Sequence, residues 1–203
     1  MSTLRRRSNQ KTQKLAVTSL LSALIIVMAF TPIGYLKIGV AIAITFIPIP
    51  VAIGAIVGGP ACGAILGAVF GITSLIQCFG LDPFGTNLMS INPFFTALLC
   101  IVPRILMGVI SGLLFKALNK KIKSTIVTYG ISAFSGGFLN TVLFVGFLIL
   151  LFRNSAVFSD YDGNILAIVT SLVTINAVIE WIACLFLGTA VAKAISKILN
   201  KAK

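Results

Sequence analysis

The sequence contains no histidine and only four acidic residues in a chain of 203. The absence of imidazole excludes histidine-dependent catalytic triads and dyads, together with metal sites built on histidine. Four scattered carboxylates are too few for the acidic metal clusters that phospholipid-processing enzymes use. The sequence also has no Walker A motif, the loop with which P-loop ATPases bind nucleotide. We therefore expect no catalytic residue, no metal site and no cofactor.

Cysteine is scarce as well, and the spacing of the cysteines matches no metal-binding or redox motif. The four cysteines occur singly in or beside apolar segments, at Cys62, Cys78, Cys100 and Cys184. Because no CxxC pair exists, we interpret them as small packing residues.

Charged residues make up only 10% of the chain, whereas hydrophobic residues make up 58% and the mean hydropathy is +1.10. A soluble domain is about a quarter charged, so this chain lacks the polar surface that a water-facing body needs. A transmembrane helix takes roughly 20 mostly apolar residues, so about six fit into this length and leave no room for a soluble domain. The composition predicts an all-α membrane protein.

Apolar runs between proline- and glycine-containing breaks predict a bundle of six transmembrane helices. The runs cover residues 14–30, 37–57, 61–79, 94–118, 125–152 and 165–195. Pro48 and Pro50 interrupt the second run, and Pro103 lies inside the fourth. Two turn-rich stretches, residues 31–37 and 80–92, separate runs on one side of the membrane and are candidate lids.

Basic residues predict the orientation of the bundle. Residues 1–14 hold five, residues 116–123 hold four and residues 193–203 hold four, so one side carries 13 of the 16. Cytoplasmic segments retain Lys and Arg, so we expect both termini in the cytoplasm and attribute the net charge of +12 to topology, not to nucleic-acid binding. The expected organisation is a basic segment at 1–13, a transmembrane domain at 14–195 and a basic tail at 196–203.

A layer of polar side chains lies unusually deep in the predicted helices. Arg104 is about ten residues, or roughly 15 Å, from the outer end of its run, and Asn140 and Asn176 lie at a similar depth. Glu180 follows Asn176 by four residues and shares its helix face. Either Arg104 pairs with Glu180 while the asparagines tie helices together, or these side chains line a pocket in which Arg104 binds an anion. Interhelical polar contacts stabilise a bundle by only about 0.6 kcal/mol each on average, which does not offset the cost of burying a guanidinium. We therefore favour the pocket.

Polar residues nearer the outer ends of the runs extend this candidate pocket. They are Tyr35, Gln77, Asn87 and Asn92. Aromatic residues near the pocket are few, with Tyr35, Phe79 and Trp181 as the candidates, and this favours a small flexible ligand over a large flat ring.

Small residues at four-residue spacing indicate close helix packing. Gly59, Gly63, Gly67 and Gly71 form one such series, which we expect to pack inside the protein. Ser19 and Ala23 form a shorter one in the first run, where contact with another subunit is possible.

Four segments together resemble a known family. They are IPIPV at 47–51, GGPACGAILG at 58–67, NP at 92–93 and VPRILMG at 102–108. Their succession is similar to the signature of substrate-binding S components of energy-coupling factor (ECF) vitamin transporters, and the resemblance covers nearly the whole chain.

The resemblance implies a multi-pass cell-membrane protein that binds a small water-soluble vitamin from outside. It further implies association with a transmembrane coupling subunit and two cytoplasmic ATPases, which supply the ATP hydrolysis that this chain cannot. In the family a small-residue pair on the first helix docks the coupling subunit, and Ser19 and Ala23 occupy the matching positions, with serine in place of alanine.

Within the family, the turn at 31–35 and the Pro103-Arg104 step are most similar to the pantothenate-type branch. Pantothenate offers one carboxylate to Arg104 and hydroxyl and amide groups to Asn140, Asn176 and Glu180. S components for folate, riboflavin or cobalamin remain alternatives, as does a non-transport scaffold of the cell envelope, although a scaffold would not need a polar layer. A self-sufficient transporter would need an inverted repeat, which the sequence lacks.

Overall fold

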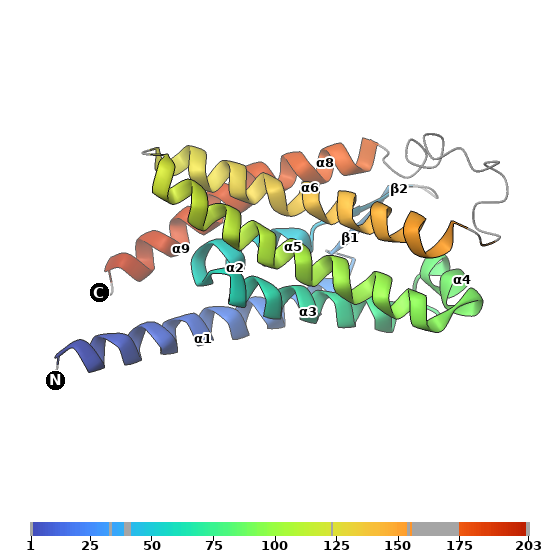
Figure 1. The fold of residues 1–203 in the computed structure, drawn as a ribbon, viewed down its shortest axis with the longest axis horizontal. Helices are drawn as coiled ribbons and strands as arrows, with labels where there is room; N and C mark the ends of the chain where they lie inside the picture. Colours follow the sequence, from blue (N-terminus) through green and yellow to red (C-terminus); the bar gives the residue numbers. More distant parts are fainter. Residues whose placement is uncertain are drawn as a thin grey trace.

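The computed structural model describes residues 2–32, 34–38, 42–122, 124–153, 155 and 175–201. Five long helical segments among the described residues are candidate membrane spans, and Figure 1 shows them running along the molecule. They are α1 (Ser2–Ala29), α3 (Pro60–Gln77), α5 (Pro93–Lys121), α6 (Thr125–Phe152) and a carboxyl-terminal helix made of α8 (Ile175–Ala183), the π-helical turn η2 (Cys184–Gly188) and α9 (Thr189–Lys201). Each segment is long and apolar enough to cross a membrane. The structure thus confirms a helical membrane protein, with five long candidate spans among the described residues instead of six.

The predicted second transmembrane helix, residues 37–57, is wrong as a continuous element. Its first half forms two short antiparallel strands, β1 (Tyr35–Ile38) and β2 (Ile42–Thr45), with Tyr35 opposite Thr45. Only its second half is helical, as α2 (Pro48–Gly58). Ile38, Ile42, Ile44 and Thr45 are β-branched and favour strands, whereas Pro48 has the fixed φ that suits the first turn of a helix.

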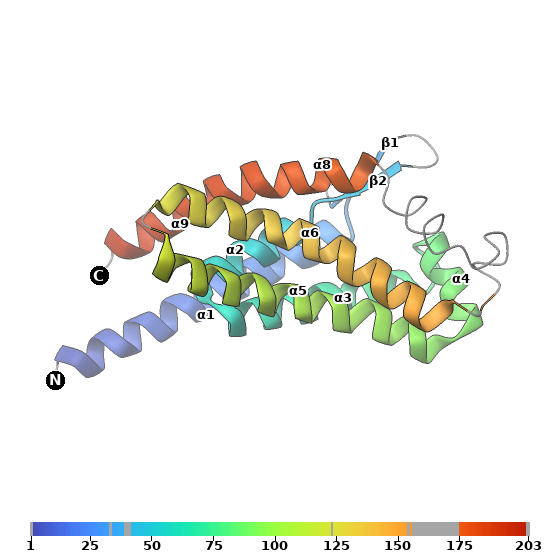
Figure 2. The same cartoon turned by 45° about the horizontal axis from the view of Figure 1, so that its top comes forward.

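The short helix α2 is enclosed by the longer ones. All residues from Pro48 to Ile56 are buried. With 11 residues, α2 is about 16 Å long, which is about half the thickness of the hydrocarbon core. Figure 2 shows α2 inside the bundle and the strands β1 and β2 near the start of α8.

The stretch at 80–92, predicted as a loop, contains a further helix, α4 (Pro83–Ile91). The Asp82 side chain caps it by accepting a hydrogen bond from the Gly85 N–H at 2.8 Å, and proline occupies its first turn. Leu88 of α4 is buried in a cluster with Leu99 of α5 and Leu148 of α6. The helix therefore covers the end of the bundle that lies away from the termini (Figure 1).

The other predicted spans agree with the structure in the residues that it describes. The runs at 61–79, 94–118 and 125–152 correspond to α3, α5 and α6. The helix α1 begins at Ser2 and so extends through the predicted basic segment at 1–13. The first ten residues of the predicted sixth run, 165–174, lie outside the described residues.

The glycine series in α3 packs against α5, as expected for three of its four members. A Cβ atom added at Gly63 or Gly67 would collide with the carbonyl oxygen of Gly108 or Arg104, respectively. At Gly71 it would lie 2.8 Å from the Cα of Ile101. Gly59 has a different role, because it joins α2 to α3 with a φ of 92°, a conformation that L side chains rarely adopt.

Gly67→Ala is expected to lower the thermal stability of the purified protein, because its new methyl group must push the α5 backbone away at Arg104. Overpacking of this kind costs about 1–3 kcal/mol. The matched control is Gly146→Ala in α6, where nothing lies within 4 Å of an added Cβ atom. Thermal unfolding in detergent should show a lower Tm for the first variant alone. An unchanged Tm for Gly67→Ala would contradict the close contact between α3 and α5.

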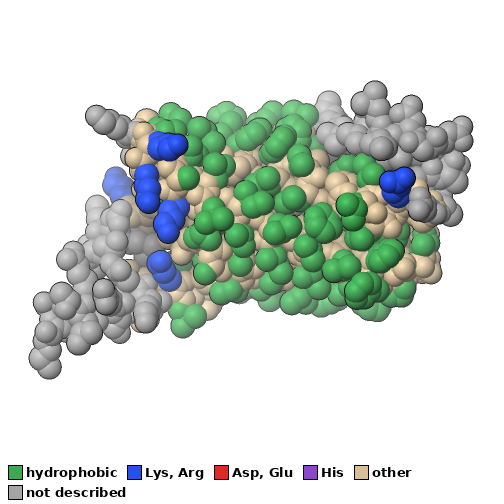
Figure 3. Space-filling model, viewed as in Figure 1, with side chains coloured by type: hydrophobic (Ala, Val, Ile, Leu, Met, Phe, Trp, Pro, Cys, Tyr) green, Lys and Arg blue, Asp and Glu red, His purple; other side chains and the backbone are tan. Residues whose placement is uncertain are grey.

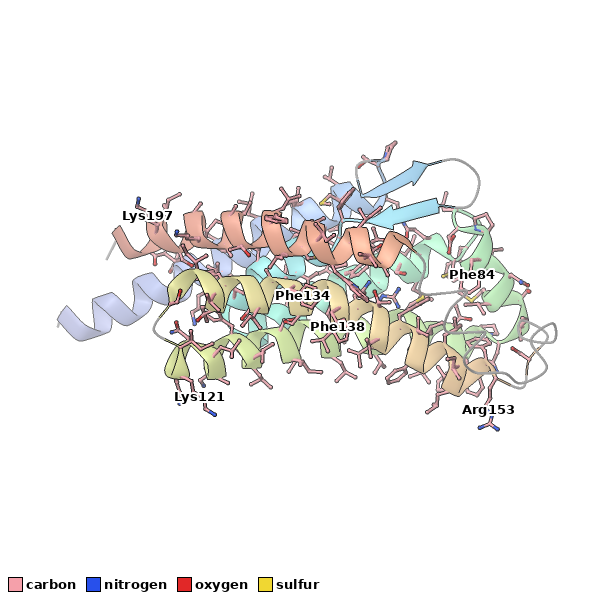
Figure 4. The ribbon with its side chains drawn as sticks, turned by 90° about the horizontal axis from the view of Figure 1, so that it is seen from above. Phe84, Lys121, Phe134, Phe138, Arg153 and Lys197 are labelled. Atoms are coloured by element: carbon pink, nitrogen blue, oxygen red, sulfur yellow. The ribbon has the colours of Figure 1, made fainter. Side chains whose placement is uncertain are left out.

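The two ends of the molecule differ in charge. Most of the Lys and Arg side chains on the face shown in Figure 3 gather at one end. Lys121 at the end of α5 and Lys197 in α9 lie there, whereas Phe84 and Arg153 lie at the opposite end (Figure 4). Both chain termini are also at the lysine-rich end (Figure 1). The α4 end is therefore the one with few basic residues.

Candidate functional site

Arg104 lies inside the bundle, where its side chain is only 7% exposed. The residue before it explains how its guanidinium is held. Pro103 has no N–H, so it cannot donate the helical hydrogen bond to the carbonyl oxygen of Leu99, four residues earlier. The Nη1 atom of Arg104 donates to that carbonyl at 2.6 Å instead. The Pro103-Arg104 step thus fixes the guanidinium through an acceptor that the proline itself leaves open.

Two aromatic rings from neighbouring helices flank the guanidinium. Its central carbon lies 4.6 Å from the ring centroid of Phe144 in α6 and 5.4 Å from that of Phe70 in α3. Such cation–π contacts stabilise a desolvated cation by up to about 2 kcal/mol. Three helices therefore position one positive charge in an apolar interior.

Phe79 and Trp181, two of the aromatic residues predicted near the pocket, have other described surroundings. Phe79 is 73% exposed. The Trp181 ring packs edge-on against Phe138 of α6, and its Nε1 donates to the Thr141 hydroxyl at 3.2 Å. Phe134 and Phe138 mark this aromatic group on α6 in Figure 4.

Asn140 lies on α6, one helical turn before Phe144. Residues four apart share a helix face, so Asn140 is on the side of α6 that meets the guanidinium. Its Oδ1 atom is buried and accepts no hydrogen bond within the described residues. A buried amide oxygen without a donor is costly and calls for an explanation. A donor group on a bound ligand would provide one.

Glu180 lies on α8 and is buried. Its Oε1 atom accepts a hydrogen bond from the backbone N–H of Thr45 at 2.7 Å. Thr45 is the last residue of β2, so this bond joins the strand pair to the carboxyl-terminal helix.

At Gly137 an added Cβ would lie 3.0 Å from the Cys184 sulfur, so this glycine allows α8 and η2 to pack closely against α6.

The described contacts of Arg104 and Glu180 are thus separate. The guanidinium meets the Leu99 carbonyl and two rings, whereas the carboxylate meets the backbone of β2. The interpretation in which the two charges pair with each other and the one in which Arg104 binds an anion both stay predictions.

Glu180→Ala is expected to speed hydrogen exchange at the Thr45 amide, because it removes the acceptor of that N–H. A hydrogen bond to a charged group is worth about 1.5–3 kcal/mol, equivalent to an exchange rate roughly 10- to 150-fold higher. Glu180→Gln retains a side-chain oxygen acceptor and should preserve most of the protection. Hydrogen-exchange mass spectrometry of peptides that contain Thr45 measures this, and equal protection in the alanine variant and the wild type would contradict the bond.

The remaining predicted site residues either make other contacts in the structure or have side chains outside its described part. The Gln77 side chain donates to the carbonyl of Ala29, the last residue of α1. The Asn92 Oδ1 atom accepts from the Phe95 N–H at 3.1 Å and so caps α5. Asn87 is exposed on α4. Tyr35 and Asn176 belong to β1 and α8, but their side chains lie outside the described part of the chain.

The predicted docking pair lies on an open face of α1. Ser19 and Ala23 are both exposed, whereas Thr18, Leu21 and Ile25 are buried. The Thr18 hydroxyl lies 2.9 Å from the Cys62 sulfur of α3, which fixes the rotation of α1 against the bundle. The two small residues therefore face away from the rest of this chain.

Comparison with known proteins agrees with this architecture. A family model described as "ECF transporter, substrate-specific component" matches residues 13–192. The pantothenate transporter PanT of Leuconostoc mesenteroides subsp. mesenteroides is 30% identical over 204 residues, covering 96% of this chain and 98% of that protein. The pantothenic acid transporter PanT of Lactococcus lactis subsp. cremoris is 30% identical over 168 residues, covering 77% and 79%, respectively. This multi-pass membrane protein belongs to the family of substrate-specific components of ECF transporters.

Proposed function

We propose that this protein captures pantothenate from outside the cell and delivers it inward as the S component of an ECF importer. The observation that carries the proposal is the buried guanidinium of Arg104, held between the rings of Phe70 and Phe144. An arginine so far from water is stable only when its charge is well solvated by the protein or balanced by an anion. Two relatives with pantothenate in their names support the choice of ligand.

The chemistry of pantothenate suits the described groups. Its single carboxylate would receive paired N–H donors from the guanidinium, which is the strongest geometry for such a contact. Its hydroxyl and amide N–H groups are donors for the buried Oδ1 atom of Asn140. The flexible, ring-free vitamin also needs no flat stacking surface. Asn176, Glu180, Gln77, Tyr35, Asn87 and Asn92 complete our proposed ligand-binding set.

We further propose six passages across the membrane, with both termini in the cytoplasm. The second passage combines the strand pair with the short helix α2. The complete burial of residues 48–56 places the helical half of this passage inside the bundle. Non-helical backbone is tolerated at membrane depth only where protein encloses it, so we expect the strand pair to be enclosed as well. The lysine-rich end then faces the cytoplasm, and α4 faces outside.

Transport requires partners that hydrolyse ATP. Family membership implies association with an ECF module, and we propose a transmembrane coupling subunit and two cytoplasmic ATPases. The exposed Ser19 and Ala23 face of α1 is the proposed docking surface.

Calorimetric titration of the purified protein in detergent tests the ligand assignment. Pantothenate, folate, riboflavin, thiamine, biotin and cobalamin would be added separately. Pantothenate alone is expected to bind with a submicromolar Kd. Tight binding of another vitamin instead would replace the ligand assignment, and the absence of any tight binding would contradict the receptor function.

Pro103→Ala is expected to reduce the preference of the protein for pantothenate over pantothenol, in which an alcohol replaces the carboxylate. Alanine restores an N–H donor that competes with the guanidinium for the Leu99 carbonyl, which weakens the contact that orients the guanidinium. A hydrogen bond of a charged group is worth about 1.5–3 kcal/mol, so its complete loss would make the affinity ratio roughly 10- to 150-fold smaller, and its weakening a fraction of that. A general loss of structure would weaken both ligands equally and leave the ratio unchanged. Pro93→Ala, at the first turn of the same helix, is the matched control.

A further inference from the structure

Two cysteines meet at the α4 end of the bundle. Cys78 caps the carboxyl end of α3, and Cys100 lies in α5. Their sulfur atoms are 3.7 Å apart, and each side chain is only 4% exposed. Ser74 contacts both thiols, since its carbonyl accepts from Cys78 at 3.3 Å and its hydroxyl donates to Cys100 at 3.9 Å. From the sequence we interpreted both residues as packing residues, so this pair was not predicted.

The other two cysteines are placed differently. The Cys62 sulfur has the Thr18 hydroxyl as its neighbour, at 2.9 Å. Cys184 lies against Gly137 in the packing of η2 on α6. All four thiols are free in this structure, so they provide one adjacent pair and two internal controls. In a disulfide the sulfur atoms are about 2.05 Å apart, so the pair must close by only about 1.7 Å.

We propose that Cys78 and Cys100 form a reversible disulfide that covalently joins the end of α3 to α5. A hydroperoxide is the oxidant class. One thiolate attacks the peroxide oxygen and becomes a sulfenic acid, releasing an alcohol, or water when the oxidant is hydrogen peroxide. The second thiol then displaces water from the sulfenic acid and forms the S–S bond. Two thiols and one hydroperoxide thus give one disulfide, one alcohol and one water, and a dithiol reductant reverses the reaction.

The position of this bond connects it to the candidate site. Cys100 precedes Arg104 by four residues, so both lie on one face of α5, a single turn apart. The Cys78 sulfur lies against the first turn of α4, where it would collide with a Cβ atom added at Gly85. The disulfide would therefore fix the spacing of three helices next to Arg104. If pantothenate is the ligand, as proposed above, its dissociation from the oxidised protein should be several-fold slower.

The covalent step is tested on the purified full chain in detergent. The protein is treated with hydrogen peroxide and then denatured in the presence of N-ethylmaleimide, which labels each free thiol. Mass spectrometry then counts the labels. The reduced wild type should take up four maleimides and the oxidised wild type two, and dithiothreitol should restore four. Peptide mapping should find Cys78 linked to Cys100. Four maleimides after oxidation, or a link between other cysteines, would overturn the proposal.

Two variants keep the test decisive. The double variant Cys62→Ser with Cys184→Ser retains only the proposed pair and should lose both reactive thiols on oxidation, with a mass decrease of two hydrogens. Cys78→Ser leaves Cys100 without an adjacent thiol and should form no disulfide, so any thiol that it loses to peroxide should appear as an added oxygen and not as a loss of two hydrogens. A loss of two hydrogens in Cys78→Ser would contradict the pairing.

The functional consequence has a separate readout. Pantothenate dissociation is measured by displacement of labelled ligand before and after oxidation, and again after dithiothreitol. An unchanged dissociation rate of pantothenate from protein that carries the disulfide would overturn the proposed effect of the disulfide on the Arg104 site. Failure of the reduced protein to bind pantothenate would contradict the proposed function. The mass measurement would still decide, independently of ligand binding, whether the disulfide forms.

Discussion

Replacement of Arg104 by alanine is expected to weaken pantothenate binding by about 30- to 5,000-fold, which corresponds to roughly 2–5 kcal/mol. The side chain is buried between two rings, so a ligand carboxylate that reaches it has already lost its water. Without the guanidinium, that carboxylate would remain desolvated and unpaired. Isothermal titration calorimetry of the purified variant measures the loss directly.

Arg153→Ala is the matched control for this prediction. Arg153 is exposed at the end of α6 and should be replaceable without effect on ligand affinity. Arg104→Lys keeps the charge but not the planar fork of donors, so it should recover only part of the affinity. Wild-type affinity in an Arg104→Ala variant that folds normally would place the ligand elsewhere.

Replacement of Ser19 or Ala23 by tryptophan is expected to abolish pantothenate uptake while leaving ligand affinity unchanged. Small residues four apart let a second helix approach the backbone closely, and a large ring at either position would keep that helix away. Both positions are exposed in this chain, so the substitutions should not disturb its own packing. Uptake is measured in proteoliposomes that contain the protein and a complete ECF module, and affinity is measured by calorimetry.

Leu24→Trp provides the control for the docking surface. Leu24 is also exposed on α1 but lies about 100° around the helix from Ala23, so uptake should persist. Normal uptake by the Ser19 and Ala23 variants would exclude this face as the docking surface. A parallel loss of ligand affinity would instead indicate that the substitutions disturb the fold.

The sequence predicted those helices whose ends carry clear signals. The runs that became α3, α5 and α6 are bounded by proline, glycine or lysine-rich breaks, and the structure places their ends within a few residues of the predictions. The run at 37–57 was wrongly predicted as one helix because nearly all of its residues are apolar. In such a run neither the helical nor the strand period is visible, and the β-branched residues before Pro48 were the remaining signal. For α4, Asp82 followed by Pro83 was a readable helix start that the loop-like composition obscured.

Part of the candidate site was predictable because polar residues are rare in apolar helices. Arg104, Asn140 and Glu180 are polar groups in apolar helices and stand out in the sequence. Phe70 and Phe144 do not stand out, because the chain is 58% hydrophobic and contains 15 phenylalanines. Their packing against Arg104 depends on how three helices are rotated, which residue spacing alone does not determine.

Other contacts leave no trace in the sequence at all. The partner of Glu180 is the backbone N–H of Thr45, 135 residues away, and every residue except proline offers such a donor. Cys78 and Cys100 are 22 residues apart, a spacing that matches no redox or metal motif. Their proximity arises because α4 folds back and brings the beginning of α5 beside the end of α3.

We propose that Arg104 binds the carboxylate of the ligand, and a thermodynamic cycle gives the sharpest test of this contact. The affinities of pantothenate and pantothenol are measured by calorimetry for the wild type and for Arg104→Ala. We expect a coupling energy between the guanidinium and the carboxylate of at least about 1.5 kcal/mol, with pantothenol affinity little changed by the substitution. A coupling energy near zero, with both ligands weakened equally, would contradict the claim.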